Sequence, residues 1–394
     1  MRPQAGLGVR PSRTARARGR TDEGNPLSLF TDAATDDGAR PPRRTRPGWI
    51  ILGVALVAII VLGAMPAPYV IDLPGPVYNT LGTAEHDGEQ VPLISIPDEK
   101  TYETEGSLDL LTVSQKGNRE QQPGWFEVAT SWFDPTRAVL PIDAVFPEDV
   151  SDDQIQQQSQ AAMVDSQQDA IAAALVELGY DFPREVTVAG ITEKSPAEGV
   201  LEEGDIITAL NGAEVHDTQA LRDAVADNGT DKPATVDYER DGVAASAEIT
   251  PIDADGTALI GVGVRMNYEF PFDVDIQLDN VGGPSAGQMF ALGIIDKLTP
   301  GLLNGGENVA GTGTIDSAGT IGAIGGIRQK LYGAKDAGAD WFLAPASNCT
   351  EVVGHVPDGL TVFSVKTLDD SMTVLDTIAN GGDTSALPSC SSAS

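Results

Sequence analysis

The sequence predicts a mixed α/β (α+β) protein with two folded domains behind one N-terminal apolar helix. Three observations support this fold class. Residues 49–65 form an almost unbroken apolar run, residues 181–252 combine short strands with one helix and tight turns, and the glycine-rich residues 253–381 alternate β-like runs with helices. A chain of 394 residues is long enough for two or three domains, each with its own core.

Residues 1–47 are basic and have no apolar periodicity, which predicts a disordered tail. They hold ten arginines against five acidic residues, whereas the whole chain has a formal net charge of −33. The rest of the chain is therefore strongly acidic. Such a body repels nucleic acid and anionic membrane surfaces, so no nucleic-acid partner is expected.

Residues 48–70 are predicted to form a transmembrane helix. Residues 48–71 contain no charge, and with its flanks the apolar run reaches about 20 residues, enough to span a bilayer. The arginines just before it place the N-terminus in the cytoplasm by the positive-inside rule. Everything that follows would then lie on the extracytoplasmic side of the cell membrane. A cleaved signal peptide is the alternative, although its basic region would be unusually long.

Three further segments connect or flank the domains. Residues 71–150 carry Pro-Gly-Pro turn signals and short β-type runs, and this β-rich segment can also supply strands to a neighbouring domain. Residues 151–180 are rich in glutamine with apolar residues at helical spacing, which predicts a helical connector. Residues 382–394 form a polar tail.

Residues 181–252 present strand, cap and turn signals in a compact order. Val186 and Val188 alternate with a polar residue as in a strand, and Ser195 begins a capping box with proline at the first helical position. Asn211 opens an Asn-Gly hairpin signal. Together these motifs resemble a bacterial PDZ domain.

The resemblance to a PDZ domain implies peptide binding. PDZ domains take a peptide as an added strand beside their helix. By that resemblance the groove would include Leu221 and Val225, which lie on the predicted helix. For each side chain alone, a position in the domain core is the simpler interpretation.

Residues 282–287 read Gly-Gly-Pro-Ser-Ala-Gly and contain a candidate nucleophile, Ser285. Gly283 ends a strand-like segment, and Pro284 suits the first turn of the helix that follows. Ser285 is therefore expected in the opening turn of a helix, where unpaired backbone N–H groups can stabilise an oxyanion. A serine in such a position can equally have no chemical role.

Lys330 is the candidate base for Ser285. On a helical wheel it lies beside the apolar face formed by Ile327, Leu331 and Ala334. Loss of solvation there lowers a lysine pKa from about 10.4 toward neutrality, and a neutral lysine can deprotonate a serine. The alternative is a packed stem whose ammonium reaches water.

A histidine-based hydrolase is a second interpretation of the same serine. Residues 283–287 also fit G-x-S-x-G, and Asp340 and His355 follow in the order that a Ser-His-Asp esterase requires. However, the segment before the serine looks like a PDZ domain, whereas that motif belongs in the middle of a βαβ series.

The serine motif and the Gly-Gly-x-x-x-Lys motif together resemble the Lon-type Ser–Lys peptidases. The closer resemblance is to their membrane-anchored bacterial branch with a PDZ domain, the YlbL-like proteins, and it covers residues 49 to about 380. It implies a Lon-type proteolytic domain over residues 253–381, with Ser285 as nucleophile, Lys330 as general base and Thr312 in support. Gly282 and Gln329 replace acidic residues that many members carry beside the dyad.

The resemblance further implies a membrane-anchored serine endopeptidase that cleaves proteins or peptides outside the cytoplasmic membrane. It implies no cofactor and no metal. No G-x-x-x-x-G-K-[ST] motif occurs in the sequence, so activity without ATP is expected. A homo-oligomer stays open, as does the choice between substrate recognition and regulation for the PDZ domain. The rivals are a catalytically silent PDZ scaffold and the esterase.

Two cysteines, Cys349 and Cys390, complete the set of candidate residues. An even, sparse number of cysteines in an oxidising compartment suggests one disulfide. Two free thiols are the alternative, because the sequence does not show proximity.

Overall fold

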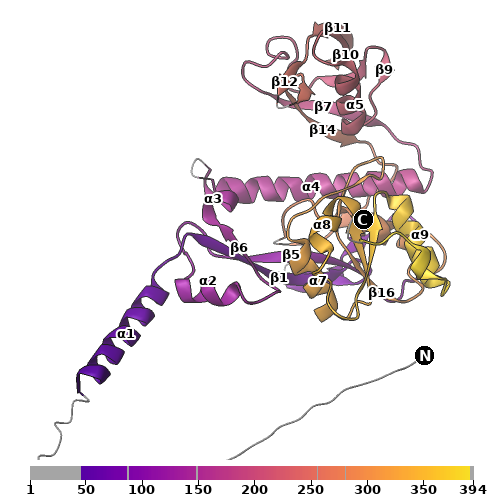
Figure 1. Ribbon diagram of the computed structural model, residues 1–394. Helices are drawn as coiled ribbons and strands as arrows, with labels where there is room; N and C mark the ends of the chain where they lie inside the picture. Colours follow the sequence, from indigo (N-terminus) through magenta and orange to yellow (C-terminus); the bar gives the residue numbers. More distant parts are fainter. Residues whose placement is uncertain (1–45, 87, 148–149, 255, 280, 391–394) are drawn as a thin grey trace, which may run out of the picture. The chain divides into compact units, whose positions relative to one another are not determined.

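The computed structural model describes residues 46–86, 88–147, 150–254, 256–279 and 281–390 (Figure 1). The predicted basic tail over residues 1–47 lies outside this part of the chain except for its last two residues. The final four residues of the predicted polar tail also lie outside it.

Helix α1 (Arg46–Ala64) contains most of the apolar run. It ends where Pro66 and Pro68 follow, because proline removes a backbone donor and disfavours a helical conformation in the residue before it. Within the described ranges, no helix has both the length and the apolarity needed to traverse a bilayer. Helix α1 ends at Ala64, before the predicted end of the apolar helix at residue 70, and strand β1 begins at Tyr69.

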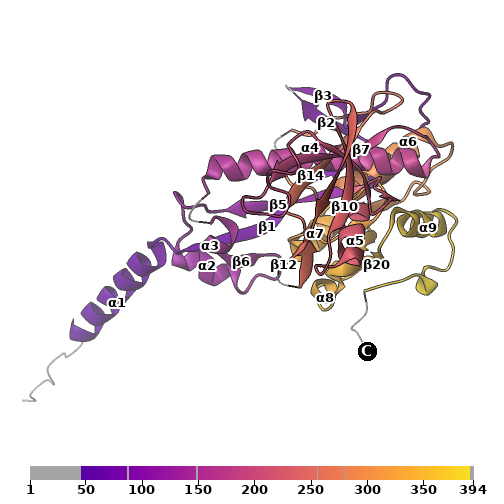
Figure 2. The same cartoon turned by 90° about the horizontal axis from the view of Figure 1, so that it is seen from above.

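A six-stranded sheet organises the main domain. Its strand order is β20-β19-β16-β5-β1-β6, with β16, β19 and β20 parallel to β5 and with β1 antiparallel to both β5 and β6. The strands β5, β1 and β6 lie side by side in Figure 2. In sheet order the strands are Thr361–Val365, Trp341–Pro345, Asn308–Gly311, Ser107–Lys116, Tyr69–Asn79 and Ala138–Pro141. Residues 71–150 therefore share one sheet with strands from the last hundred residues.

Helices cover both faces of this sheet. Successive residues of β5 point to opposite faces, so Leu110 packs with one core and Leu111 with the other. The first core includes α4 (Asp152–Glu177), α6 (Gly287–Leu298) and α9 (Leu368–Ala379). The second includes α7 (Ile327–Asp336). The predicted connector over residues 151–180 is α4, and its last third belongs to the first core.

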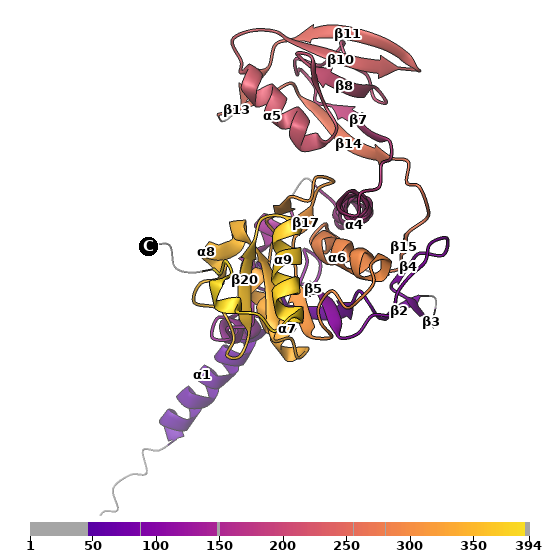
Figure 3. The same cartoon turned by 90° about the vertical axis from the view of Figure 1, so that its right-hand side faces the viewer.

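A second sheet forms an inserted domain, here residues 184–268. Its order is β11-β10-β8-β7-β14, with β9 paired to β8, and Figure 3 displays the strands in this order. The elements in chain order are β7 (Arg184–Ile191), β8 (Ile206–Leu210), β9 (Ala213–Glu214), α5 (Thr218–Asn228), β10 (Ala234–Arg240), β11 (Val243–Ile249) and β14 (Val262–Tyr268). The domain extends past residue 252 because apolar residues of β14, such as Val264, pack against its core.

The remaining elements are short and lie in the connections. They are β2 (Thr83–His86), β3 (Glu89–Pro92), β4 (Ile94–Ser95), α2 (Trp125–Ser131), α3 (Ile142–Val145), β12 (Ile252–Ala254), β13 (Thr257–Leu259), β15 (Asp275–Ile276), β17 (Thr314–Ile315), β18 (Ile321–Gly322), η1 (Ala346–Asn348), α8 (Cys349–Val352) and η2 (Thr384–Ala386).

A disulfide joins Cys349 to Cys390, as expected from the cysteine count. Near it, Ser364 of β20 donates its backbone N–H to the carbonyl oxygen of Pro388, and Phe363 forms a β-bridge with Ser389. The bond therefore holds the C-terminal segment along the outer strand of the main sheet.

Candidate active site

Ser285 and Lys330 meet in the structure. The Nζ of Lys330 donates hydrogen bonds to Oγ of Ser285 at 2.7 Å and to Oγ1 of Thr312 at 2.8 Å. Thr312 in turn donates from Oγ1 to the backbone carbonyl oxygen of Ser285 at 2.9 Å. The three side chains predicted to lie together thus form one hydrogen-bonded cluster.

Lys330 reaches the cluster because of how α7 begins and packs. Ile327 and Leu331 are fully buried against the sheet, which turns the adjacent Lys330 inward and leaves it 2% exposed. The helix starts after Gly326, which has a φ of 70°, a conformation that favours glycine. A Cβ at Gly326 would also lie 2.6 Å from a methyl of Val113 on β5. Gly326 thus allows α7 to approach the strand that supports it.

Burial also changes the acidity of the lysine. Desolvation lowers the pKa of Lys330 from 10.5 to about 7, because a low-dielectric environment penalises the ammonium. A substantial fraction of the amine is therefore neutral near pH 7. Because Lys330 is only 2% exposed, the alternative of a packed stem with its ammonium in bulk water is wrong.

The loop that carries Ser285 is held by α4 from the side opposite the sheet. The backbone N–H of Gly283 donates to the carbonyl oxygen of Ser159 at 2.8 Å. The hydroxyl of Ser166 donates to the carbonyl oxygen of Pro284 at 2.9 Å. Ser159 and Ser166 lie seven residues apart, two helical turns, so both face the loop. Sequence reasoning missed both contacts, because Ser159 takes part through its backbone carbonyl oxygen and the partner of the Ser166 hydroxyl lies 118 residues away in the chain.

Two details of the serine loop differ from expectation. Helix α6 begins at Gly287, so Ser285 precedes the helix and Pro284 is not in its first turn. Gly283 has a φ of 85°, which lets the chain turn sharply before the serine. At Gly282, where an acidic residue was noted as missing, a Cβ would lie 2.3 Å from Oγ of Ser159. Glycine therefore permits the close approach of α4.

The Ser-His-Asp arrangement is not formed. The Nδ1 of His355 lies 3.2 Å from the backbone carbonyl oxygen of Val353, and Asp340 lies 3.5 Å from Nζ of Lys335. The side-chain partner that the structure gives Ser285 is Lys330. This geometry therefore does not support the alternative of a histidine-based esterase.

Ser285 and Lys330 lie on the wall of a cleft of about 590 Å³. One side is formed by β5 and the other by α4 and the serine loop. The lining residues are Pro76, Tyr78, Leu110, Leu111, Thr112, Val113, Ser114, Gln115, Ser159, Met163, Val281, Gly282, Pro284, Ser285, Ala286, Gly325 and Lys330. A buried base beside a hydroxyl that opens onto a cleft can support nucleophilic attack on a bound carbonyl.

The two residues expected in the peptide groove of the inserted domain are core residues. Leu221 is 4% exposed and Val225 is 5% exposed, and both pack with Val188 and Val236. A peptide bound beside α5 would therefore meet other side chains of that helix.

Two family models match the chain. Residues 157–250 match the PDZ domain, and residues 280–377 match the Lon protease (S16) C-terminal proteolytic domain. The second match includes Ser285, Thr312 and Lys330. The chain thus combines a PDZ domain with a proteolytic domain of the serine peptidase class.

Curated relatives agree with the second match. Lon protease 2 of Herpetosiphon aurantiacus is 37% identical over 95 residues, which is 23% of this chain and 11% of that protein. Lon protease 2 of Bacillus subtilis is 34% identical over 113 residues, 27% of this chain and 19% of that protein. Lon protease of Buchnera aphidicola is 27% identical over 120 residues, 29% and 15% of the two chains. The matched region is thus less than a fifth of each relative.

Solved structures match about a fifth of the chain. The PDZ domain of the SdrC-like protein from Listeria innocua is 28% identical and covers 20% of this chain and 92% of that one, with a TM-score of 0.19. The corresponding domain from Listeria monocytogenes is also 28% identical, with 20% and 85% coverage and a TM-score of 0.19.

Proposed function

We propose that this chain is a serine endopeptidase in which Ser285 is the nucleophile and Lys330 is the general base. One observation carries the proposal: a lysine amine that is almost fully buried lies 2.7 Å from a serine hydroxyl on the wall of a cleft. The match of residues 280–377 to a Lon proteolytic domain supports the same reaction class.

In the proposed reaction, neutral Lys330 accepts the hydroxyl proton of Ser285 while Oγ forms a bond to the carbonyl carbon of the peptide. The carbonyl π electrons move onto the oxygen and give a tetrahedral oxyanion. The ammonium of Lys330 then returns the proton to the leaving nitrogen as the C–N bond breaks, which leaves an ester on Ser285. Water then attacks the ester carbonyl while Lys330 accepts a proton from it. The C–Oγ bond breaks to release the peptide acid, and the Lys330 ammonium returns the proton to Oγ.

Thr312 orients the dyad in this proposal. Its Oγ1 accepts from Nζ of Lys330 and donates to the carbonyl oxygen of Ser285, so it fixes both residues at once. The positive end of the α6 dipole lies just beyond Ser285 and favours the developing oxyanion.

Digestion of a peptide mixture by the full chain tests the function. Ser285→Ala should abolish cleavage, and an active-site-directed serine label should attach to the parent protein alone. Lys335→Ala is the matched control because Lys335 lies on the same helix but interacts with the exposed carbonyl of Gly359. The assay is run with and without ATP, and equal rates are expected. A folded protein that neither cleaves nor takes the label would favour the silent PDZ scaffold.

We also propose that the inserted domain binds an extended peptide along β14. This strand is the last in its sheet and pairs only with β7 there, so its other edge can accept an added strand. The test is binding of fluorescent peptides to the Ser285→Ala protein. Ala224→Arg, at a half-buried position of α5 on the rim of that core, should weaken binding, and exposed Arg222→Ala should not.

A membrane location with residues 1–47 in the cytoplasm and both domains outside is our further proposal. It rests on exposed apolar groups. The side chains of α1 from Trp49 to Leu62 are exposed, and so are Phe126, Trp132 and Phe133 on and after α2, the last at 89%. Water disfavours such surfaces, and aromatic residues concentrate at membrane interfaces. The test is partition of the full chain into liposomes. Loss of partition in the double variant Phe126→Ser, Phe133→Ser would support contact of these aromatic side chains with the membrane.

A further inference from the structure

A second cleft continues the one that holds Ser285. Its volume is about 420 Å³, and it shares four lining residues with the first: Ser159, Met163, Val281 and Gly282. The shared residues come from α4 and from the segment before the nucleophile. A ligand seated at Ser285 can therefore extend past Gly282 between these two walls.

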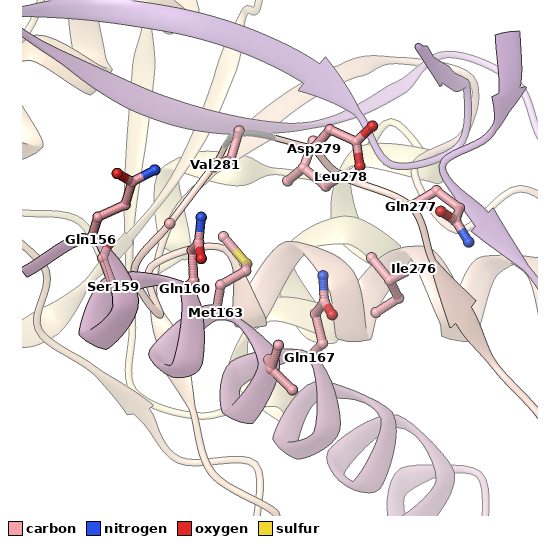
Figure 4. Close-up of a pocket in the computed structure, with 12 residues that line it drawn as sticks. Gln156, Ser159, Gln160, Met163, Gln167, Ile276, Gln277, Leu278, Asp279 and Val281 are labelled. Carbon is pink, nitrogen blue, oxygen red and sulfur yellow. The ribbon is translucent and has the colours of Figure 1, made fainter. Parts of the chain in front are cut away.

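The α4 wall of the second cleft is lined with amides. Gln156, Gln160 and Gln167 lie four and seven residues apart, so they share one face of the helix. Figure 4 shows their side chains rising from α4 toward residues 276–279 and 281. A glutamine amide both donates and accepts hydrogen bonds. It can pair with the N–H and C=O groups of an extended peptide whatever the peptide sequence.

The opposite wall carries three apolar side chains together with Gln277 and Asp279. Met163 lies between the glutamines, and Ile276, Leu278 and Val281 face it from the other segment (Figure 4). Among the residues that the structure describes, no lysine or arginine lines this cleft. Its one carboxylate belongs to Asp279, whose oxygens lie 3.0 Å from Nδ1 of His86. The cleft therefore offers no cation to an acidic ligand.

Glutamines occur on other faces of α4 as well, among them Gln157 and Gln168. The amides alone would thus describe an ordinary solvated helix. The face with Gln156, Gln160 and Gln167 differs from the others because its cleft is continuous with the Ser285 cleft. A bound peptide that extends from Ser285 past Gly282 must lie on this face.

We infer that this amide-lined cleft is a substrate subsite that binds an uncharged, extended peptide segment on one side of the scissile bond. The inference rests on the proposed peptidase function. From Ser159 to Gln167 the helix rises about 12 Å, at about 1.5 Å per residue. An extended peptide advances about 3.4 Å per residue, so the subsite holds three to four residues.

The chemistry of the lining sets the preference of the subsite. Aliphatic side chains fit over Met163 and Leu278, and neutral polar groups fit beside the amides. An aspartate or glutamate would lose water without gaining a cation, which is unfavourable. Substrates with acidic residues at these positions should therefore be cut poorly.

Aligned cut sites test the subsite without knowledge of the natural substrate. The full chain digests a mixture of peptides from casein, and mass spectrometry identifies every cut. We expect acidic residues to be depleted about tenfold over three to four positions on one side of the cut. Gln160→Lys supplies a cation and should restore acidic residues there. The matched control, Gln168→Lys, places the same charge on the same helix outside the cleft and should change nothing.

An even distribution of acidic residues, or equal effects of the two lysine variants, would overturn the subsite. Failure of the peptidase proposal is distinguishable, because the parent protein would then cut nothing. In that case the same peptides are captured on immobilised Ser285→Ala protein, which leaves the cleft intact. Gln160→Lys added to that protein should enrich acidic peptides, and Gln168→Lys added to it should not. If both lysine variants captured acidic peptides equally, this binding experiment would reject the subsite without any measurement of cleavage.

Discussion

The hydroxyl of Ser166 donates a hydrogen bond of 2.9 Å to the carbonyl oxygen of Pro284, the residue just before the candidate nucleophile. One turn further along α4, Asp169 accepts a hydrogen bond of 2.6 Å from the hydroxyl of Tyr268, the last residue of β14. Helix α4 therefore contacts the serine loop and the inserted domain through side chains on neighbouring turns. The position of Ser285 depends on a helix that lies outside the proteolytic motif itself.

Loss of the Ser166 hydroxyl should disturb catalysis more than stability. Ser166→Ala removes one hydrogen bond, worth about 1 kcal/mol of unfolding free energy. Because the loop then loses a restraint next to Ser285, we expect kcat to fall several-fold with KM little changed. Steady-state kinetics and urea unfolding measure the two effects. Gln168→Ala on an exposed face of α4 is the control, and an unchanged kcat in Ser166→Ala would contradict the role.

Lys330 should be irreplaceable by arginine. General-base assistance contributes about 10²–10⁴-fold to a rate, so Lys330→Ala should lose at least that much. Lys330→Arg should not restore it, because a guanidinium stays charged at neutral pH. His355→Ala should keep the parent rate, since His355 interacts with the backbone of Val353 instead. An active Lys330→Arg enzyme would remove Lys330 from the mechanism.

Activity should rise with pH through the lowered lysine pKa. The pKa of Lys330 is about 7, so below that value the rate should fall about tenfold per pH unit as the base becomes protonated. The free energy of unfolding should also depend on the protonation of Lys330. Between about pH 7 and 10.5 the unfolded lysine binds more protons than the folded one, so unfolding free energy rises with pH there. Lys330→Met should flatten that rise, as measured by denaturation at several pH values.

The disulfide should stabilise the C-terminal part of the main domain. Cys349 and Cys390 are 41 residues apart, and closing a loop of that size contributes roughly 3–4 kcal/mol in the chain-entropy model. A protein with both cysteines replaced by alanine should unfold at correspondingly lower denaturant concentration. Thiol titration of the denatured, unreduced parent should detect no free thiol, and two thiols per chain would refute the bond.

Protease protection tests the proposed membrane orientation. A protease added to intact spheroplasts should digest the acidic body and spare residues 1–47, because the arginines before the apolar run keep that end inside. Antibodies against a tag at each end distinguish the fragments. Protection of the body would reverse the orientation.

The sequence predicts local features of the site better than its surroundings. Ser285 and Lys330 could be found because a glycine-rich turn and a helix face are patterns of neighbouring residues. The contact of Ser159 with Gly283 could not, since about 120 residues separate them and hydrogen bonds between distant backbone groups leave no local pattern. The start of α6 at Gly287 was also missed, because proline at position 284 is compatible both with a helix and with the turn before one.

The sheet of the inserted domain also continues past residue 252 without a local signal in the sequence. Residues 262–268 alternate like any strand, and only pairing with β7 assigns them to that sheet. Similarly, the β-rich residues 71–150 gain their place beside β16 from a parallel pairing about two hundred residues away in the chain. Topology of this kind follows from long-range packing rather than from a local signal.

The two ends of the inserted domain are register partners: Arg184 of β7 pairs with Tyr268 of β14. The chain therefore leaves the main domain and returns to it at one place. When this sheet forms, the end of α4 and the segment leading to Ser285 are brought together, and a loop of more than eighty residues is in effect reduced to a few. The entropy cost of closing a loop grows with its length. We therefore expect the inserted domain to fold first, and its folding to hold the end of α4 close to the segment that leads to Ser285.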